Sequence, residues 1–99
     1  MKTDIQVNGT NMAITIEGRL DTLTVPELQA ELANYRLGEL TEIVLDLSKL
    51  EYISSAGLRV LLQAFRSMKM GGVMRIVNAN EITRKVFEVT GFDEYFTIE

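Results

Sequence analysis

The sequence contains no cysteine, no histidine and no tryptophan, and it has a single proline. Without cysteine the chain can form neither a disulfide nor a thiolate metal site, which suits a reducing compartment. Without histidine it lacks the usual general base and the commonest metal ligand, which excludes Ser-His-Asp, Cys-His and zinc-dependent hydrolysis. We therefore expect a protein that is not an enzyme and holds no metal.

Motifs for nucleotides and membranes are missing as well. The pair Gly71-Gly72 is not followed by the Gly-Lys-Ser/Thr of a phosphate-binding loop, and no G-x-G-x-x-G opens a helix. Any ATP therefore comes with a partner, and no cofactor is expected. No apolar run is long enough to cross a bilayer, and the charged start Met1–Asp4 is unlike a signal peptide. We expect a cytoplasmic protein without direct membrane insertion.

The charge balance is acidic. The net charge is −4 and the isoelectric point is near 4.8. Proteins that bind nucleic acid use lysines and arginines to displace counterions from phosphates, so this balance argues against such a partner. It favours a partner with a basic surface.

The 99 residues form one small domain, 1–99, without linker or repeat. Residues 4–7 are expected to form a strand, and Asn8-Gly9 a tight turn. Apolar and polar residues then alternate over 12–17, which predicts a second strand that ends at Gly18.

The first predicted helix begins after Thr24. Thr24 and Glu27 have the spacing of a capping box, and Pro26 is tolerated in a first helical turn. The helix is expected to end before Gly38 and to turn four side chains inward: Val25, Leu28, Leu32 and Tyr35.

The most informative stretch is residues 43–70. Its apolar start, Ile43–Leu45, favours a strand covered on both faces, which closes with Asp46 ahead of a polar loop. Apolar residues then recur with helical spacing, which predicts a helix from about Ser55. Five residues of that helix are expected to face the sheet: Leu58, Leu61, Leu62, Phe65 and Met68.

The last third of the chain predicts a strand over 73–77 and a helix capped by Asn80 and followed by Gly91. Three residues of this helix are expected to be buried: Ile82, Val86 and Val89. Three aromatic residues are expected to pack the C-terminal segment, which adds a last short strand: Phe92, Tyr95 and Phe96. The predicted fold class is α/β, a mixed β-sheet of four to five strands packed with three to four α-helices.

Two serines, Ser54 and Ser55, stand where the central helix begins, and such a position has two interpretations. A serine hydroxyl there accepts a hydrogen bond from a free N–H of the first turn, worth about 1 kcal/mol. A helix N-terminus also stabilises an anion through its dipole and its unpaired N–H groups, so a phosphoserine would fit. The two interpretations do not exclude each other.

Two segments resemble the STAS domains of bacterial anti-sigma factor antagonists. The first, Leu45–Leu58, reads LDLSKLEYISSAGL: a strand ending in Asp, a loop, and a serine-glycine turn that opens a helix. The second, Gly18–Thr22, reads GRLDT. The resemblance extends over essentially the whole chain and implies a single STAS domain. In that family the phosphoacceptor stands two residues before the glycine, which is Ser55 here.

The resemblance also implies a partner-binding surface around the acceptor. Asp21 and Asp46 would lie near it, although hydrogen bonding within their own loops also accounts for each of them. Gly57 would let the backbone of a partner come close, or it reflects tight packing. The implied surface consists of Asp21, Thr22, Asp46, Ser54, Ser55, Ala56, Gly57 and Leu58, with Arg59 as an extension.

Two further serines compete with Ser55 as modified residues. Ser54 stands where many antagonists have Asp, so two adjacent hydroxyls are available and the family pattern selects Ser55. Ser48 lies in a loop that is modified in some regulatory STAS proteins, but it is also an ordinary turn serine.

The resemblance implies a phosphorylation switch. The unphosphorylated protein would bind an anti-sigma factor that is also a serine kinase of the histidine-kinase-type ATPase fold, and so release the sigma factor. Phosphorylation of Ser55 would end binding, and a phosphatase would restore it. The alternative is a STAS subunit of a transporter or of a stress-sensing scaffold, in which Ser55 is only a cap. One docking face requires no dimer, so the free protein is expected to be a monomer.

Overall fold

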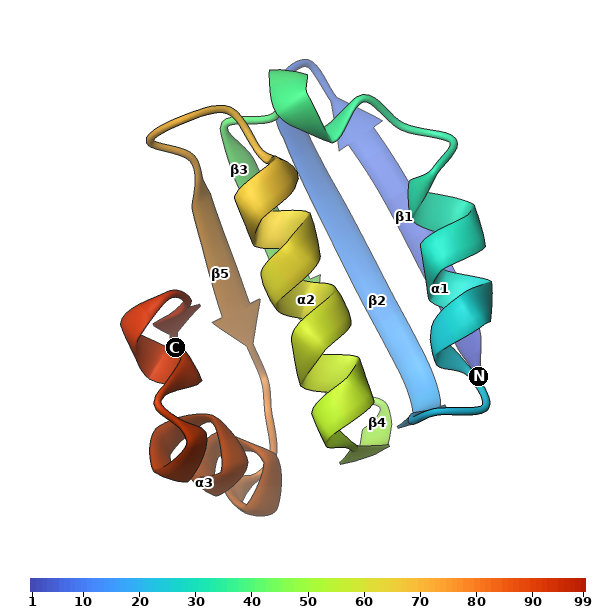
Figure 1. The fold of residues 1–99 in the computed structure, drawn as a ribbon, viewed down its shortest axis with the longest axis vertical. Coiled ribbons are helices and arrows are strands. Elements are labelled where there is room, and N and C mark those ends of the chain that lie inside the picture. Colours follow the sequence, from blue (N-terminus) through green and yellow to red (C-terminus); the bar gives the residue numbers. More distant parts are fainter.

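The computed structural model describes all residues from Met1 to Glu99. Helices cross one face of a six-stranded mixed sheet (Figure 1). The strands are β1 (Lys2–Asn8), β2 (Asn11–Leu20), β3 (Glu42–Asp46), β4 (Leu50–Ile53), β5 (Val73–Val77) and β6 (Thr97–Ile98). The α-helices are α1 (Val25–Leu32), α2 (Ser55–Ser67) and α3 (Glu81–Thr90), with 3₁₀ turns at Leu37–Glu39 and Phe92–Glu94.

The strand order is β1-β2-β3-β5-β6, with β4 paired to β2. Strands β1 and β2 form an antiparallel hairpin, and all other pairs are parallel. Gly9, at the predicted Asn-Gly turn, has φ +64°, a conformation that costs glycine little. The predicted α/β class, the mixed sheet and the three α-helices are confirmed.

The sheet has one more strand than predicted, because β4 forms where the sequence suggested only a polar loop. Leu50 and Ile53 are buried, whereas Glu51 and Tyr52 between them are exposed, so the strand lacks the alternation that marks a half-buried strand. It continues along β2 beyond β3, with a register shift at Gly18. This short strand carries the chain directly into α2.

The core lies between the sheet and its helices. Ile43 and Leu45 of β3 are fully buried, but Val44 on the opposite face is only half-buried. Neighbouring Ala13 on that face is exposed. The prediction that β3 is covered on both faces is therefore wrong, because α1 and α2 both cross the same side of the sheet (Figure 1).

Helix α3 turns a face next to the predicted one toward the core, and of the three residues predicted to be buried only Val86, which is half-buried, packs against the core. Ile82 and Val89 are 78% and 68% exposed, while Thr83 and Phe87 are buried. The ring of Phe87 meets that of Phe96 edge-on, with centroids 5.9 Å apart. The helix has two apolar stripes, and the stripe with the larger aromatic side chain faces the core.

Two expectations for the first helix are also wrong. The helix ends at Leu32, so Tyr35 lies beyond it and is exposed, whereas Leu28 and Leu32 are buried as predicted. Thr24 precedes the helix but its side chain makes no capping hydrogen bond. The C-terminal aromatic residues do pack together, and Phe96 lies edge-on to Phe65 at 5.9 Å.

Candidate functional site

Helix α2 begins directly after β4, and its cap is Ser54. The backbone of Ser54 is extended, and its Oγ accepts a hydrogen bond of 3.3 Å from the Gly57 N–H. The Ser54 N–H donates to the Leu20 carbonyl at 2.9 Å. The start of α2 is therefore fixed to the end of β2 by one backbone bond.

Ser55 is the first residue of α2 and is exposed. Its hydroxyl takes part in none of the hydrogen bonds within the chain, and the Ser54 hydroxyl supplies the helix cap. Capping therefore does not explain why Ser55 is a serine. Its oxygen is free to react with, or to contact, another molecule.

Gly57 lies beneath this position and is buried. A Cβ at Gly57 would lie 2.8 Å from the Leu20 carbonyl oxygen and 2.9 Å from Cγ1 of Ile53. Of the two interpretations of this glycine, the structure supports tight packing against β2 and β4. Leu58 is only 3% exposed and belongs to the core. Neither residue presents a side chain to a partner.

Asp21 is held by the loop that follows β2. Its Oδ1 accepts hydrogen bonds from the backbone N–H groups of Leu23 at 3.0 Å and Thr24 at 3.2 Å. Its Oδ2 lies 3.3 Å from Nε of Arg19. Partial burial alone raises the pKa of the Asp21 carboxyl, but the hydrogen bonds from Thr24, Arg19 and Leu23 outweigh it and hold the pKa below its usual value.

Asp21 and Ser54 lie side by side because Leu20 pairs with Ile53 in parallel strands. Asp21 follows the first of these residues and Ser54 follows the second. The structure therefore brings together the residues that the GRLDT and SSAG motifs predicted as neighbours. Thr22, the next residue, is exposed.

Asp46 does not belong to this group. It pairs with Thr15 of β2, five residues before Leu20, so about 16 Å of strand separates it from the start of α2. It also lies on the sheet face opposite to its buried neighbour Leu45 and the core. The expectation that Asp46 neighbours Ser55 is therefore wrong, because β4 extends the chain between them.

The second interpretation of Asp46 is confirmed. Its Oδ1 accepts a hydrogen bond from the Ser48 N–H at 2.9 Å and another from the Asn78 amide at 3.3 Å. The hydrogen bonds, that of Ser48 foremost, lower the pKa of the Asp46 carboxyl. Ser48 is exposed in the turn between β3 and β4.

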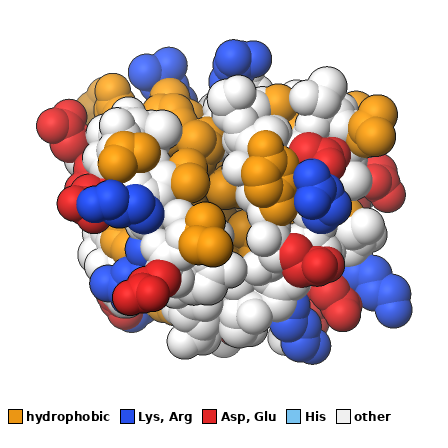
Figure 2. Space-filling view, turned by 90° about the horizontal axis from the view of Figure 1, so that it is seen from below, with side chains coloured by type: hydrophobic (Ala, Val, Ile, Leu, Met, Phe, Trp, Pro, Cys, Tyr) orange, Lys and Arg blue, Asp and Glu red, His pale blue; other side chains and the backbone are white.

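Three exposed residues beside the site were not predicted. Leu23 is 86% exposed and Tyr52 44% exposed, and the guanidinium of Arg19 lies 4.4 Å from the centre of the Tyr52 ring. Figure 2 views this end of the molecule, where hydrophobic side chains gather across the middle and charged side chains surround them. In the sequence, only Leu23 hinted at this apolar surface, because it is an apolar residue between two threonines in a predicted loop.

No group of three or more acidic side chains is arranged to hold a metal ion. None of the helices combines the length and the apolar character needed to cross a bilayer.

Comparison with known proteins defines the family. The STAS domain family model matches residues 2–99. A relative from Bordetella bronchiseptica, BtrV, described as a candidate anti-sigma factor antagonist, is 36% identical over 85 residues, which cover 84% of this chain and 72% of that protein. The chain belongs to the STAS domain family.

Solved structures share this fold. An anti-sigma factor antagonist from Mycobacterium paratuberculosis superposes with a TM-score of 0.85 at 23% identity, covering 98% of this chain and 83% of that one. The Bacillus protein SpoIIAA in its phosphorylated form superposes with a TM-score of 0.74 at 22% identity, covering 99% and 91%. The predicted STAS fold is confirmed.

Proposed function

We propose that the protein is an anti-sigma factor antagonist controlled by phosphorylation of Ser55. Its unphosphorylated form binds an anti-sigma factor that is also a serine kinase, and the sigma factor held there is released. One observation carries this proposal: Ser54 caps α2, and the exposed Ser55 hydroxyl is left without an intramolecular partner. The names of the relatives supply the partner class.

The docking surface that we propose is the exposed part of the predicted one. Ser54, Ser55 and Ala56 are at least partly accessible at the start of α2, and Asp21 and Thr22 lie on the adjacent loop. Gly57 and Leu58 contribute indirectly. Both are buried, and they determine how closely the first turn of α2 packs against β2. Leu23 and Tyr52 add apolar area at the edge of this surface.

The proposed modification is a phosphoryl transfer from Mg-ATP that the kinase brings. The Ser55 oxygen attacks the γ-phosphorus, and the bond from that phosphorus to the β,γ-bridging oxygen breaks. ADP leaves with this oxygen, and the hydroxyl proton passes to a base on the kinase. This chain contributes only the acceptor oxygen and its placement, so it is a substrate and not an enzyme.

The charge of the phosphate accounts for the switch. A phosphoserine adds about −1.5 to −2 charges, which the N-terminus of α2 tolerates. In an interface that fitted a neutral hydroxyl, the same charge adds desolvation cost and repulsion from Asp21. A penalty of about 3 kcal/mol weakens binding roughly a hundredfold. A phosphatase then restores the binding form.

Mass spectrometry of the protein from its native cell tests the proposal. We expect one phosphoryl group, mapped to Ser55, which disappears in a Ser55→Ala strain and persists in a Ser54→Ala strain. A protein that stays unmodified through growth and stress, or is modified at Ser54, contradicts it. In the first case, a transporter or scaffold recovered with the protein would favour the other STAS assemblies.

A further inference from the structure

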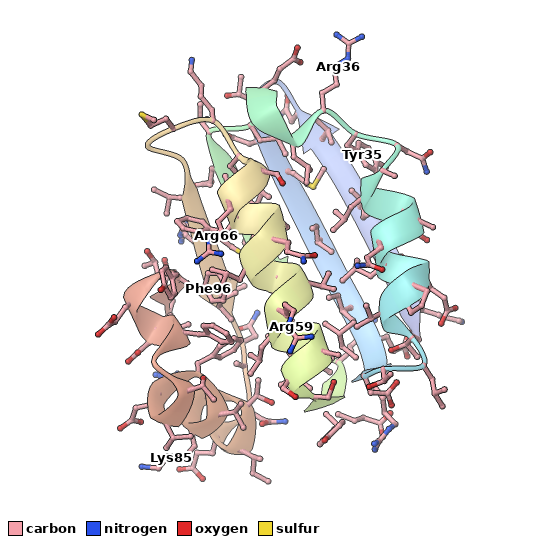
Figure 3. The ribbon with its side chains drawn as sticks, in the orientation of Figure 1. Tyr35, Arg36, Arg59, Arg66, Lys85 and Phe96 are labelled. Atoms are coloured by element: carbon pink, nitrogen blue, oxygen red, sulfur yellow. The ribbon has the colours of Figure 1, made fainter.

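Ser55 and Arg59 lie one helical turn apart on α2. Residues at i and i+4 of a helix share one face, with Cβ atoms about 5–6 Å apart. Both residues are exposed, and Figure 3 shows Arg59 on the outward side of α2, near its first turn. The guanidinium is therefore within reach of any group added to the Ser55 oxygen.

Arg59 has no acidic partner of its own. The ion pairs of the chain involve Arg19, Arg36, Arg75 and Lys85, and not Arg59. It is also the only charged residue between Ser55 and Phe65. No acidic side chain of α2 therefore lies beside Arg59, and no residue of the chain forms an ion pair with it.

No charged group on the neighbouring strands is as well placed as Arg59 to pair with an anion at Ser55. At the end of β2, Arg19 is already engaged by Asp21 at 3.3 Å and by the Tyr52 ring at 4.4 Å. Strand β4 offers Glu51, which is acidic and exposed. A guanidinium also matches phosphate oxygens with two parallel N–H donors, which makes arginine well suited to such a pair.

We propose that Arg59 is the intramolecular counter-ion of phosphorylated Ser55. The acidic group precedes the basic one by four residues, which is the favourable order for a helical ion pair. The pair neutralises part of the added charge and fixes the phosphate against the outer face of α2. Arg59 therefore sets where the phosphate stands when the partner approaches, which is a regulatory role. The inference rests on the proposed function for its biological meaning.

The test measures the second pKa of the phosphate. Phosphoserine is inserted at position 55 during translation, and the phosphorus resonance is followed by NMR as the pH is changed. A nearby cation stabilises the dianion, so we expect Arg59→Gln to raise this pKa by about 0.3 unit, a twofold change in proton affinity. Arg59→Lys should recover part of the difference.

Arg66 provides the matched control, because it is an exposed arginine of the same helix. It lies eleven residues from Ser55, about 16 Å along the helix axis, beyond the screening length at physiological salt. Arg66→Gln should change the pKa by less than about 0.1 unit. An unchanged pKa in Arg59→Gln, or an equal shift in both variants, overturns the inference.

Failure of this inference is distinguishable from failure of the proposed function. The phosphoserine is placed by translation, so the titration reports on Arg59 whether or not any kinase modifies the protein. A protein that is unmodified in its cell but shows the pKa shift would retain the ion pair and lose the proposed switch. A protein that is modified at Ser55 in its cell but shows no pKa shift would retain the proposed switch and lose the ion pair.

Discussion

Helices α2 and α3 begin in the same way, and the comparison separates capping from function. The Ser54 side chain accepts the Gly57 N–H at 3.3 Å, and that of Asn80 accepts the Thr83 N–H at 2.8 Å. Each helix also starts near an aspartate at or just after the end of a strand: Asp21 follows β2 and lies by α2, and Asp46 ends β3 and bonds Asn78 ahead of α3. The pKa of both carboxyls is lowered. A capped helix beside a hydrogen-bonded aspartate therefore does not define a site.

The difference lies at the first helical residue. In α3 this residue is Glu81, whose negative charge suits a helix N-terminus. In α2 it is Ser55, a neutral hydroxyl with no partner. Phosphorylation would give α2 the charge that α3 carries permanently, so the fold already contains an example of an anion at this position.

The largest expected effect on stability comes from the buried face of α3. Phe87→Ala removes a fully buried ring from α3 and should lower the free energy of unfolding by about 3–5 kcal/mol. Ile82→Ala, on the exposed stripe, should change it by less than about 0.5 kcal/mol. Urea unfolding of both variants measures the difference. Similar losses would mean that α3 is rotated relative to the structure described.

The two helices also differ at their third residue, which is Gly57 in α2 and Thr83 in α3. Gly57→Ala tests whether α2 requires a glycine there. The added Cβ would meet the Leu20 carbonyl oxygen at 2.8 Å. Overpacking outweighs the better helix propensity of alanine, so we expect a net loss of about 1–2 kcal/mol. Thermal unfolding, with Ala56→Gly as a second variant of the same turn, provides the measurement. A stabilised Gly57→Ala protein would rule out the close contact.

Capping itself should be similar in the two helices. Ser54→Ala and Asn80→Ala should each cost about 1 kcal/mol, with the larger loss at Asn80 because its hydrogen bond is shorter. Ser55→Ala should cost less than about 0.5 kcal/mol, because no contact is lost. Chemical denaturation of the three variants decides this. If Ser55→Ala were the most destabilised, Ser55 would be the cap and the switch would lose its support.

The smallest expected effect is on stability at acid pH, where the protein and its Asp46→Asn variant are compared. The Asp46 pKa is below the ordinary value of 3.8 in the folded protein, so its stabilising contribution is present above that pH and is lost as pH falls through the folded-state pKa. Asp46→Asn should therefore flatten the fall in stability below about pH 4. Unfolding measured between pH 2 and pH 7, in steps of about one unit, tests this. An unchanged acid profile would contradict the lowered pKa.

Much of the fold was accessible from the sequence because it is carried by local patterns. The Asn-Gly hairpin, the apolar stripe of α2 and the cap at Asn80 each follow from neighbouring residues. Strand β4 was not accessible, because its pairing with β2 depends on a register shift that no local pattern encodes. The same omission placed Asp46 near Ser55. On α3, the choice between two apolar stripes depended on where Phe96 lies, which is a tertiary fact.

The arrangement of the candidate site was predicted in part. The motifs predicted Asp21 and Ser55 as neighbours, and the structure places Asp21 beside Ser54 at the start of α2. They also predicted Gly57 and Leu58 as partner-binding residues, although both are buried. A motif records which residues recur together and not which of them face outward. The exposure of Tyr52 beside the site and the lack of an ion pair at Arg59 emerge only from the structure.

The backbone bond from the Ser54 N–H to the Leu20 carbonyl also has a consequence for measurement. It lies at one end of the pairing between β2 and β4, so it must open if β4 and α2 separate from β2. The rate at which this single amide proton exchanges with solvent therefore reports how often the start of α2 separates from β2. Slow exchange would mean that the acceptor is presented on a rigid platform, ready for a partner without rearrangement.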